Sequence, residues 1–146
     1  MFPIAADGQT QAPAAAVLDV AVDVIAANVA LYGRRGYVEP WIGYLAVDDS
    51  GQIVGSCGFT GPPVAGEVEL AYFSFPGFEG RGIATAMATA LMSLAQPAAD
   101  AGAIRYIAHT LPEEGPSPSI LRKLGFRCAG PIAHPEDGTV WKWVRD

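Results

Sequence analysis

One segment of the sequence combines the residue types that bind phosphate groups. Residues 68–85 read Val-Glu-Leu-Ala-Tyr-Phe-Ser-Phe-Pro-Gly-Phe-Glu-Gly-Arg-Gly-Ile-Ala-Thr, which predicts a strand, a short glycine turn and the opening of a helix. Such a turn directs free backbone N–H groups and the positive end of the helix dipole toward one place. Because a phosphate or pyrophosphate is the natural occupant of that place, we expect the chain to bind a phosphorylated cofactor.

Several interpretations compete for Gly80-Arg81-Gly82. A P-loop needs Gly-Lys-Ser/Thr after a four-residue spacer, which is absent here. A dinucleotide-binding turn, as in a nicotinamide-type binder, needs a third glycine where Thr85 stands, and an acidic residue after the next strand, where the chain has His109. The pyrophosphate of coenzyme A is the third cofactor candidate. A structural alternative is that the glycines only let the helix pack tightly against the sheet.

Hydrophobic periodicity predicts the elements that hold this turn in place. Residues 67–75 alternate between two faces, with Val68, Leu70 and Tyr72 on one of them, which is the pattern of a half-buried strand. From Gly82 the apolar residues recur at helical spacing until Pro97, where we expect the helix to stop. Residues 103–109 should form the next strand, parallel to the first because a helix connects the two.

The rest of the chain supplies two further helices and two strand pairs. We expect residues 1–13 to form an irregular arm, followed by a helix over residues 13–33 that begins at Pro13. Residues 41–48 and 52–59 are predicted to form a hairpin, residues 117–124 a short helix capped by Gly125, and residues 126–130 and 139–144 a last strand pair. This order describes a mixed sheet with helices on its faces.

Composition limits the class of protein. A chain of 146 residues, of which 51% are hydrophobic, fits one domain with a proper core. Its net charge of −6 argues against a nucleic-acid partner, and an acidic surface would tolerate or attract a cationic acceptor.

Cys57 and Cys128 match no metal-ligand spacing, and both are expected to be buried thiols. We see no signal peptide and no membrane span, so a cytoplasmic protein with no membrane partner is expected.

The residues around the glycine turn resemble a known family. Phe78-Glu79-Gly80-Arg81-Gly82-Ile83-Ala84-Thr85 looks like the acyl-CoA loop of GNAT-type N-acetyltransferases, whose pattern is Gln/Arg-x-x-Gly-x-Gly/Ala. Val68-Glu69-Leu70-Ala71-Tyr72 and the segment from Ser117 to Phe126 are similar to the branch that includes ribosomal-protein alanine acetyltransferases. The chain departs from the pattern at Glu79, at Glu114 or Gly115 in place of an asparagine, and at Leu121 in place of a tyrosine that often serves as general acid.

The resemblance implies an α/β (α+β) fold, a GNAT-like mixed and mostly antiparallel twisted sheet with helices on both faces, and one acyl-CoA N-acyltransferase domain over residues 1–146. It also implies acetyl-CoA as acyl donor and no metal. The edge of the predicted strand would pair with the pantetheine arm, and the glycine turn would hold the pyrophosphate, with Arg81 near the phosphates. Ser117 would hydrogen-bond the departing sulfur or cap its helix. The cofactor residues expected from this resemblance are Tyr72, Phe73, Ser74, Glu79, Gly80, Arg81, Gly82, Ile83, Ala84, Thr85 and Ser117.

Two residues are candidates for the base that deprotonates an amine acceptor. Glu69 stands in the middle of the strand beside the expected acyl site, where a carboxylate can act directly or through water. His109 ends the following strand, and its ordinary pKa of about 6.5 suits the task; His134 is expected to be structural or exposed. The sequence therefore predicts an N-acetyltransferase for a small-molecule or peptide amine, with dimer formation as a possibility of the fold. The alternative is a non-catalytic acyl-CoA sensor or interaction module.

Overall fold

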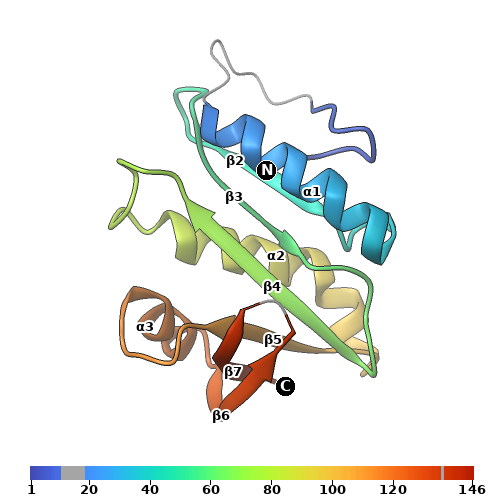
Figure 1. Cartoon of the computed structure of the whole chain (residues 1–146), viewed down its shortest axis with the longest axis vertical. Helices are drawn as coiled ribbons and strands as arrows, with labels where there is room; N and C mark the ends of the chain where they lie inside the picture. Colours follow the sequence, from blue (N-terminus) through green and yellow to red (C-terminus); the bar gives the residue numbers. More distant parts are fainter. Residues whose placement is uncertain (11–18, 136) are drawn as a thin grey trace.

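The computed structural model describes residues 1–10, 19–135 and 137–146, and these form a seven-stranded sheet with three helices (Figure 1). The strands lie in the order β1-β2-β3-β4-β5-β7-β6. The elements are β1 (Phe2–Pro3), α1 (Asp19–Arg35), β2 (Gly43–Val47), β3 (Ile53–Phe59), β4 (Glu67–Ser74), α2 (Ile83–Asp100), β5 (Arg105–Thr110), α3 (Pro116–Lys123), β6 (Arg127–His134) and β7 (Gly138–Arg145).

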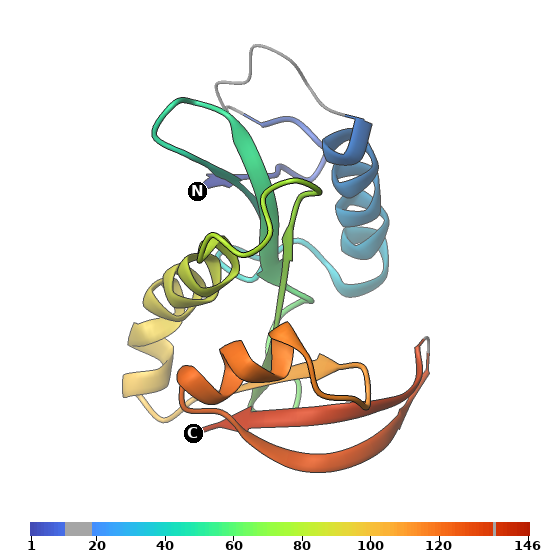
Figure 2. The ribbon, with the colours of Figure 1, turned by 90° about the vertical axis from the view of Figure 1, so that its left-hand side faces the viewer.

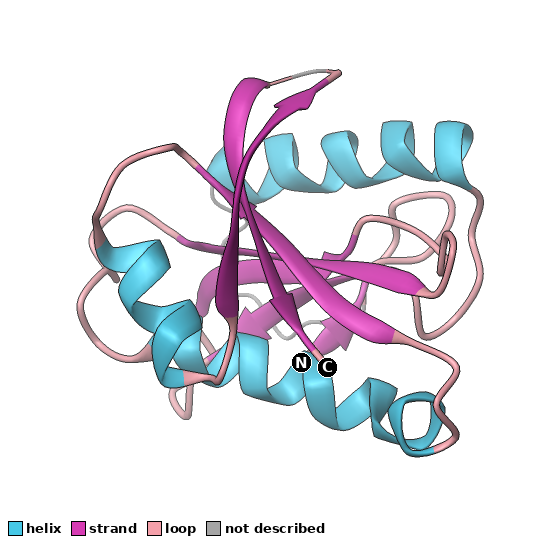
Figure 3. Cartoon of the chain, turned by 90° about the horizontal axis from the view of Figure 1, so that it is seen from below, coloured by secondary structure: helices cyan, strands magenta, loops and turns pink. Residues whose placement is uncertain are grey.

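Helices cover both faces of the sheet. Helix α1 lies on one face and α2 on the other (Figures 2 and 3), and α3 lies beside the start of α2. All strand pairs are antiparallel except β4 and β5, which are parallel because α2 connects them. The predicted mixed, mostly antiparallel sheet with helices on its two faces is therefore confirmed.

The period-2 pattern of β4 sets the orientation of its side chains. Val68 and Leu70 are 1% and 2% exposed and belong to the core, whereas Glu69, Ala71 and Phe73 occupy the opposite, more accessible face. The alternation is confirmed, and it brings the Glu69 carboxylate out of the core at the middle of the sheet.

Strands β4 and β5 form a fork. They are paired only from Glu67–Arg105 to Glu69–Ile107, and beyond that register they diverge (Figure 1). β4 continues along β3 as far as Ser74, so residues 70–74 are paired on the β3 side only within the described chain. The fork leaves one strand edge open in the interior of the sheet, next to α3.

The beginning of the chain differs from the expected irregular arm. Phe2–Pro3 adds a short strand to the edge of β2, and Ile4 is fully buried. The Tyr32 hydroxyl donates to the Ile4 carbonyl at 2.8 Å and accepts from the Gly43 N–H at 3.0 Å, so α1 holds β1 and β2 together. A two-residue strand has no periodicity for sequence reasoning to detect. The expected helix start at Pro13 lies outside the described residues.

Two further expectations were wrong. Helix α2 does not stop at Pro97 but continues to Asp100, since a proline in the last turn removes one hydrogen bond without preventing the following residues from staying helical. Cys57 is buried as expected, but Cys128 is exposed because it lies on β6, the edge strand of the sheet. The hairpin β2–β3 and the left-handed Gly125 after α3 are confirmed. Within the described ranges, none of the helices has the length and apolar character needed to cross a membrane.

Candidate active site

The glycine turn before α2 opens onto free space. Gly80 and Gly82 have φ values of +75° and +76°, which side-chain-bearing residues rarely adopt, and a Cβ built on either would meet nothing within 4 Å. The interpretation that these glycines allow close packing of helix and sheet is therefore wrong. They are required by the backbone conformation, and the space beside them is available to a ligand that approaches the start of the helix.

A pocket of about 300 Å³ extends from this turn to α3. It contains six of the residues expected to bind the cofactor, together with a cation that the sequence reasoning missed, Lys123 in the last turn of α3. The missed residue had a signal, because Lys123 belongs to the segment that resembles the closing helix of the family. The pocket is lined by Ser74, Gly80, Gly82, Ile83, Ala84, Thr85, Pro116, Ser119, Ile120 and Lys123.

Glu79 and Arg81 take up defined positions around the turn. The Glu79 carboxylate accepts a hydrogen bond from the Gly77 N–H at 2.9 Å, so it is turned back onto its own loop. The Arg81 guanidinium lies over the Phe78 ring, 5.3 Å from its centroid. The carboxylate that departs from the family pattern is thus occupied within the loop, and a cation is held at its side.

Two hydroxyl groups meet between β4 and α3. The Tyr72 and Ser117 hydroxyl oxygens are 3.0 Å apart. Helix α3 is capped by Gly115 without a side-chain hydrogen bond, so the expectation that Ser117 caps it is wrong. Burial raises the pKa of Tyr72, and the hydrogen bond with Ser117 offsets part of that rise. Leu121, at the family's tyrosine position, is fully buried in the core and offers no proton.

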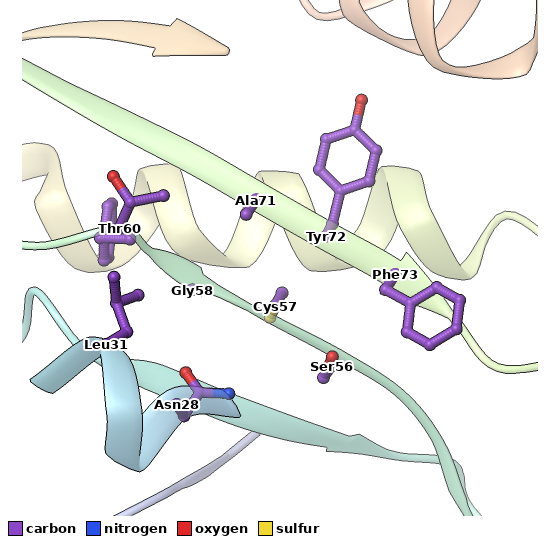
Figure 4. Close-up of a pocket in the computed structure, with 10 residues that line it drawn as sticks. Asn28, Leu31, Ser56, Cys57, Gly58, Thr60, Ala71, Tyr72 and Phe73 are labelled. Carbon is purple, nitrogen blue, oxygen red and sulfur yellow. The ribbon is translucent and has the colours of Figure 1, made fainter. Parts of the chain in front are cut away.

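The Tyr72 ring projects from β4 toward α3 and away from α1. Figure 4 shows it pointing away from Asn28 and Leu31 of α1, which line a pocket of about 150 Å³ on the other side of β3 and β4. Phe73, the next residue, extends along the end of the strand and is 45% exposed. The Tyr72 hydroxyl therefore reaches Ser117 at the fork, although Tyr72 also contributes to the lining of the α1 pocket.

Glu69 and His109 come together where the fork opens. The His109 Nδ1 atom lies 3.0 Å from Oε2 of Glu69, and the two side chains are 12% and 21% exposed. This is an ion-pair distance, but the ring is not aligned for a hydrogen bond, and the buried Nδ1 atom has no other hydrogen-bond partner among the described residues. Catalytic hydrogen bonds are often poorly aligned before substrate binds. The Thr60 hydroxyl lies 3.3 Å from Oε1 of Glu69 and steadies the carboxylate.

His134 lies beside this pair, and the hydrogen bond from the Asp137 N–H to its Nδ1 atom agrees with the structural role expected for it. Its ring centroid is 5.2 Å from that of His109, and its Nδ1 atom accepts from the Asp137 N–H at 3.2 Å. The ligand atoms of Glu69, His109 and His134 lie within 4.8 Å of one another, so these three residues could hold a metal ion. Their positions in the sequence give no sign of this, because only the fold brings the end of β6 at His134 close to His109 of β5.

A larger pocket opens on the accessible side of Glu69. Its volume is about 390 Å³, and Glu67, Thr60 and Arg35 contribute polar groups to it. Burial acts to raise the pKa of Glu67, but hydrogen bonds from Lys142 and Arg105 outweigh that effect and lower it. Both cations contact the Glu67 carboxylate, at distances from 2.9 to 3.3 Å. Glu67 is therefore neutralised, and Glu69 is the carboxylate that remains for a ligand.

The comparison with protein families agrees with this geometry. Residues 6–127 match the family model described as the acetyltransferase (GNAT) domain. The chain belongs to the GNAT family. As in the sequence resemblance, the matched region includes the strand β4, the glycine turn and α3.

Solved structures of several acetyltransferases have the same fold. One is RimL, a ribosomal L7/L12 alpha-N-protein acetyltransferase in complex with coenzyme A, with 21% identity and a TM-score of 0.63 over 89% of this chain and 73% of RimL. Another is an acetyltransferase from Salmonella typhimurium that modifies the N-terminal serine of L7/L12, with 21% identity, a TM-score of 0.60, and 84% and 71% of the two chains covered. An acetyltransferase from Agrobacterium tumefaciens has 18% identity and a TM-score of 0.59, with 91% and 74% covered. No curated protein matches the sequence. At these identities the likeness shows the fold.

Proposed function

We propose that this GNAT protein transfers an acetyl group from acetyl-CoA to a primary amine, which attacks the thioester directly. The observation that carries the proposal is the fork between β4 and β5. A carboxylate–histidine pair lies at its vertex, a hydroxyl pair lies along its open edge, and an open glycine turn lies at its far end. Acyl transfer needs a base, a proton donor for the thiolate and a binding site for the cofactor phosphates. These three groups follow one another along the fork, as they would along an extended thioester cofactor.

The cofactor would bind along the free edge of β4. Backbone groups of residues 70–74 have no strand partner on the β5 side in the described chain, so an extended pantetheine arm can add to them as a strand does. Its pyrophosphate would lie at the N–H groups of the glycine turn, with Arg81 and Lys123 as counter-charges. RimL, which shares the fold, was solved with coenzyme A bound.

The proton transfers follow from the two side-chain pairs. An ammonium acceptor loses a proton to Glu69, directly or through water, and His109 shares the charge. The amine nitrogen then attacks the thioester carbon, and the C–S bond breaks as the C–N bond forms. The nitrogen loses one of its two remaining protons to solvent and keeps the other in the product amide. The proton that is lost balances the one that the departing thiolate takes up. The CoA thiolate takes a proton from Ser117 or Tyr72, whose hydroxyls form one hydrogen-bonded pair. This hydroxyl pair would donate the proton that the apolar Leu121 side chain cannot supply.

The test separates binding from turnover. Thermal unfolding is measured with acetyl-CoA, CoA and NAD, and thiol release is measured with a panel of amines. Acetyl-CoA at one hundred times its dissociation constant should add about 2.7 kcal/mol to the free energy of unfolding, and NAD should add nothing. Glu69→Gln and His109→Gln should keep the acetyl-CoA shift but lower kcat at least about 100-fold. Glu113→Gln, which replaces an exposed carboxylate in the loop between β5 and α3, is the matched control.

The results have distinct meanings. An acetyl-CoA shift without thiol release for any amine would favour the acyl-CoA sensor or interaction module. No shift with acetyl-CoA would refute the cofactor assignment, and turnover that survives both Glu69→Gln and His109→Gln would refute the assignment of the base. Comparison of Tyr72→Phe with Ser117→Ala shows which hydroxyl serves the thiolate, because the variant that removes the donor lowers kcat with little change in the acetyl-CoA shift.

A further inference from the structure

The pocket beside Glu69 is also lined by a cation. Arg35, the last residue of α1, and Glu69 line the same space of about 390 Å³. The Arg35 guanidinium makes no ion pair with any described residue, whereas Glu67 in the same pocket is paired with Lys142 and Arg105. The pocket therefore presents one unused positive group together with the candidate base, in a protein whose overall charge is −6.

The loop between β3 and β4 fixes the spacing of these two groups. A Cβ at Gly61 would lie 3.0 Å from Cβ and 3.1 Å from Nε of Arg35, so the arginine stem rests on the Gly61 backbone. The hydroxyl oxygen of Thr60, the residue before Gly61, is 3.3 Å from Oε1 of Glu69. Adjacent Cα atoms are about 3.8 Å apart, so the Arg35 guanidinium and the Glu69 carboxylate each contact one of two neighbouring residues of this loop. A small molecule can span the two.

We propose that the acceptor is a small amine that also carries a carboxylate, as an α-amino acid does, with its ammonium at Glu69 and its carboxylate at Arg35. The inference rests on the proposed function and names the acceptor of that site. A guanidinium presents N–H donors in a fork that matches a carboxylate, and the volume of about 390 Å³ is in the range of small-molecule pockets. The acidic composition had favoured cationic acceptors, but the local charges around this pocket point the other way.

A helix-end arginine has a simpler role that must be separated from this one. Arg34 and Arg35 both lie in the last turn of α1, where a cation interacts favourably with the helix dipole. Only Arg35 lines the pocket. Arg34→Gln is therefore the matched control for Arg35→Gln, since both substitutions remove one positive charge from the same helix end.

The experiment measures thiol release from acetyl-CoA with the twenty L-α-amino acids, with the corresponding amides, and with polyamines and short peptides that have a free N-terminus. We expect at least one amino acid to be acetylated with a lower KM than its amide. Arg35→Gln should raise the KM for that acid about 10- to 100-fold, as expected for a lost charge-assisted hydrogen bond, and should leave the KM of the amide unchanged. Arg34→Gln should change neither value.

Each other result is informative. Acetylation of polyamines or peptide N-termini with no amino acid accepted would overturn the inference and leave the proposed function standing. An equal effect of Arg35→Gln on acid and amide, or an equal effect of both arginine variants, would also overturn it. If acetyl-CoA binds but no amine is acetylated, the proposed enzyme function fails together with the inference, and the acetyl-CoA shift in thermal unfolding identifies that case.

Discussion

Replacement of Gly82 by alanine tests two roles of this residue separately: its positive φ, which affects stability, and the open space beside it, which affects ligand binding. The added Cβ meets nothing within 4 Å, so the cost to the fold comes from φ = +76° alone. An alanine in this conformation costs about 1–2 kcal/mol, partly offset by about 0.4–1 kcal/mol from the lower entropy of the unfolded chain. We expect a net loss of about 1 kcal/mol, which for a chain of this length lowers Tm by about 2–4 °C.

The effect on ligand binding should be larger than the effect on stability. The methyl group would project into the pocket that begins at the glycine turn, and one N–H bond to a phosphate is worth about 1.5–3 kcal/mol. The Kd of acetyl-CoA should therefore rise about 10- to 100-fold, measured by calorimetry at a temperature where the variant is fully folded.

Gly102 provides the matched control. It lies in the turn after α2, has φ = +72°, and its Cβ would also meet nothing within 4 Å. Gly102→Ala should lower Tm by a similar amount and leave the Kd unchanged. The reasoning would be refuted if Gly82→Ala bound acetyl-CoA as tightly as Gly102→Ala, or if the loss of stability in Gly82→Ala were several kcal/mol, which would indicate a packing contact.

The remaining predictions concern acid stability, buried polar groups and thiols. The lowered pKa of Glu67 contributes stability that is present above the unfolded pKa of about 4.3 and is lost as the pH falls through the folded pKa. In urea titrations between about pH 5 and pH 3, Glu67→Gln should therefore reduce the loss of stability with falling pH. An unchanged pH dependence would exclude Glu67 as its source. Thr110→Val removes the acceptor for the Trp143 Nε1–H, which is 3.0 Å from the threonine oxygen, and should cost about 1–3 kcal/mol in urea unfolding, whereas a neutral result would mean that the buried indole finds another acceptor. A thiol reagent at pH 8 should modify Cys128 in the native protein and Cys57 only after unfolding, because burial raises the pKa of Cys57 to about 12; two thiols reacting at equal rates would contradict the burial of Cys57.

Elements with a strong local pattern were predictable from the sequence. The alternation in β4 gave the strand and the outward direction of Glu69, and the helix between β4 and β5 gave their parallel arrangement. The glycine turn was predictable because glycine, unlike other residues, readily adopts the positive φ values that such a turn needs. These features depend on residues that are close together in the chain.

The features that were missed depend on contacts between distant residues. His134 reaches His109 only because the β6–β7 hairpin folds across the end of β5, and no spacing in the sequence indicates this. Arg35 joins the pocket of Glu69 through the end of α1 and the loop at Gly61. The exposure of Cys128 follows from the outer position of β6 in the sheet, which the alternation of its own residues does not reveal.

The short parallel seam between β4 and β5 joins two parts of the sheet, each of which is contiguous in sequence. β1 to β4 with α1 and α2 are contiguous in sequence, as are β5 to β7 with α3, and only three residue pairs of parallel strand join the two sheet halves. The Glu69–His109 and Tyr72–Ser117 contacts both cross this seam. In increasing denaturant, amide hydrogens at the seam should exchange before those inside either half, so the candidate site should come apart while most of the secondary structure is still intact.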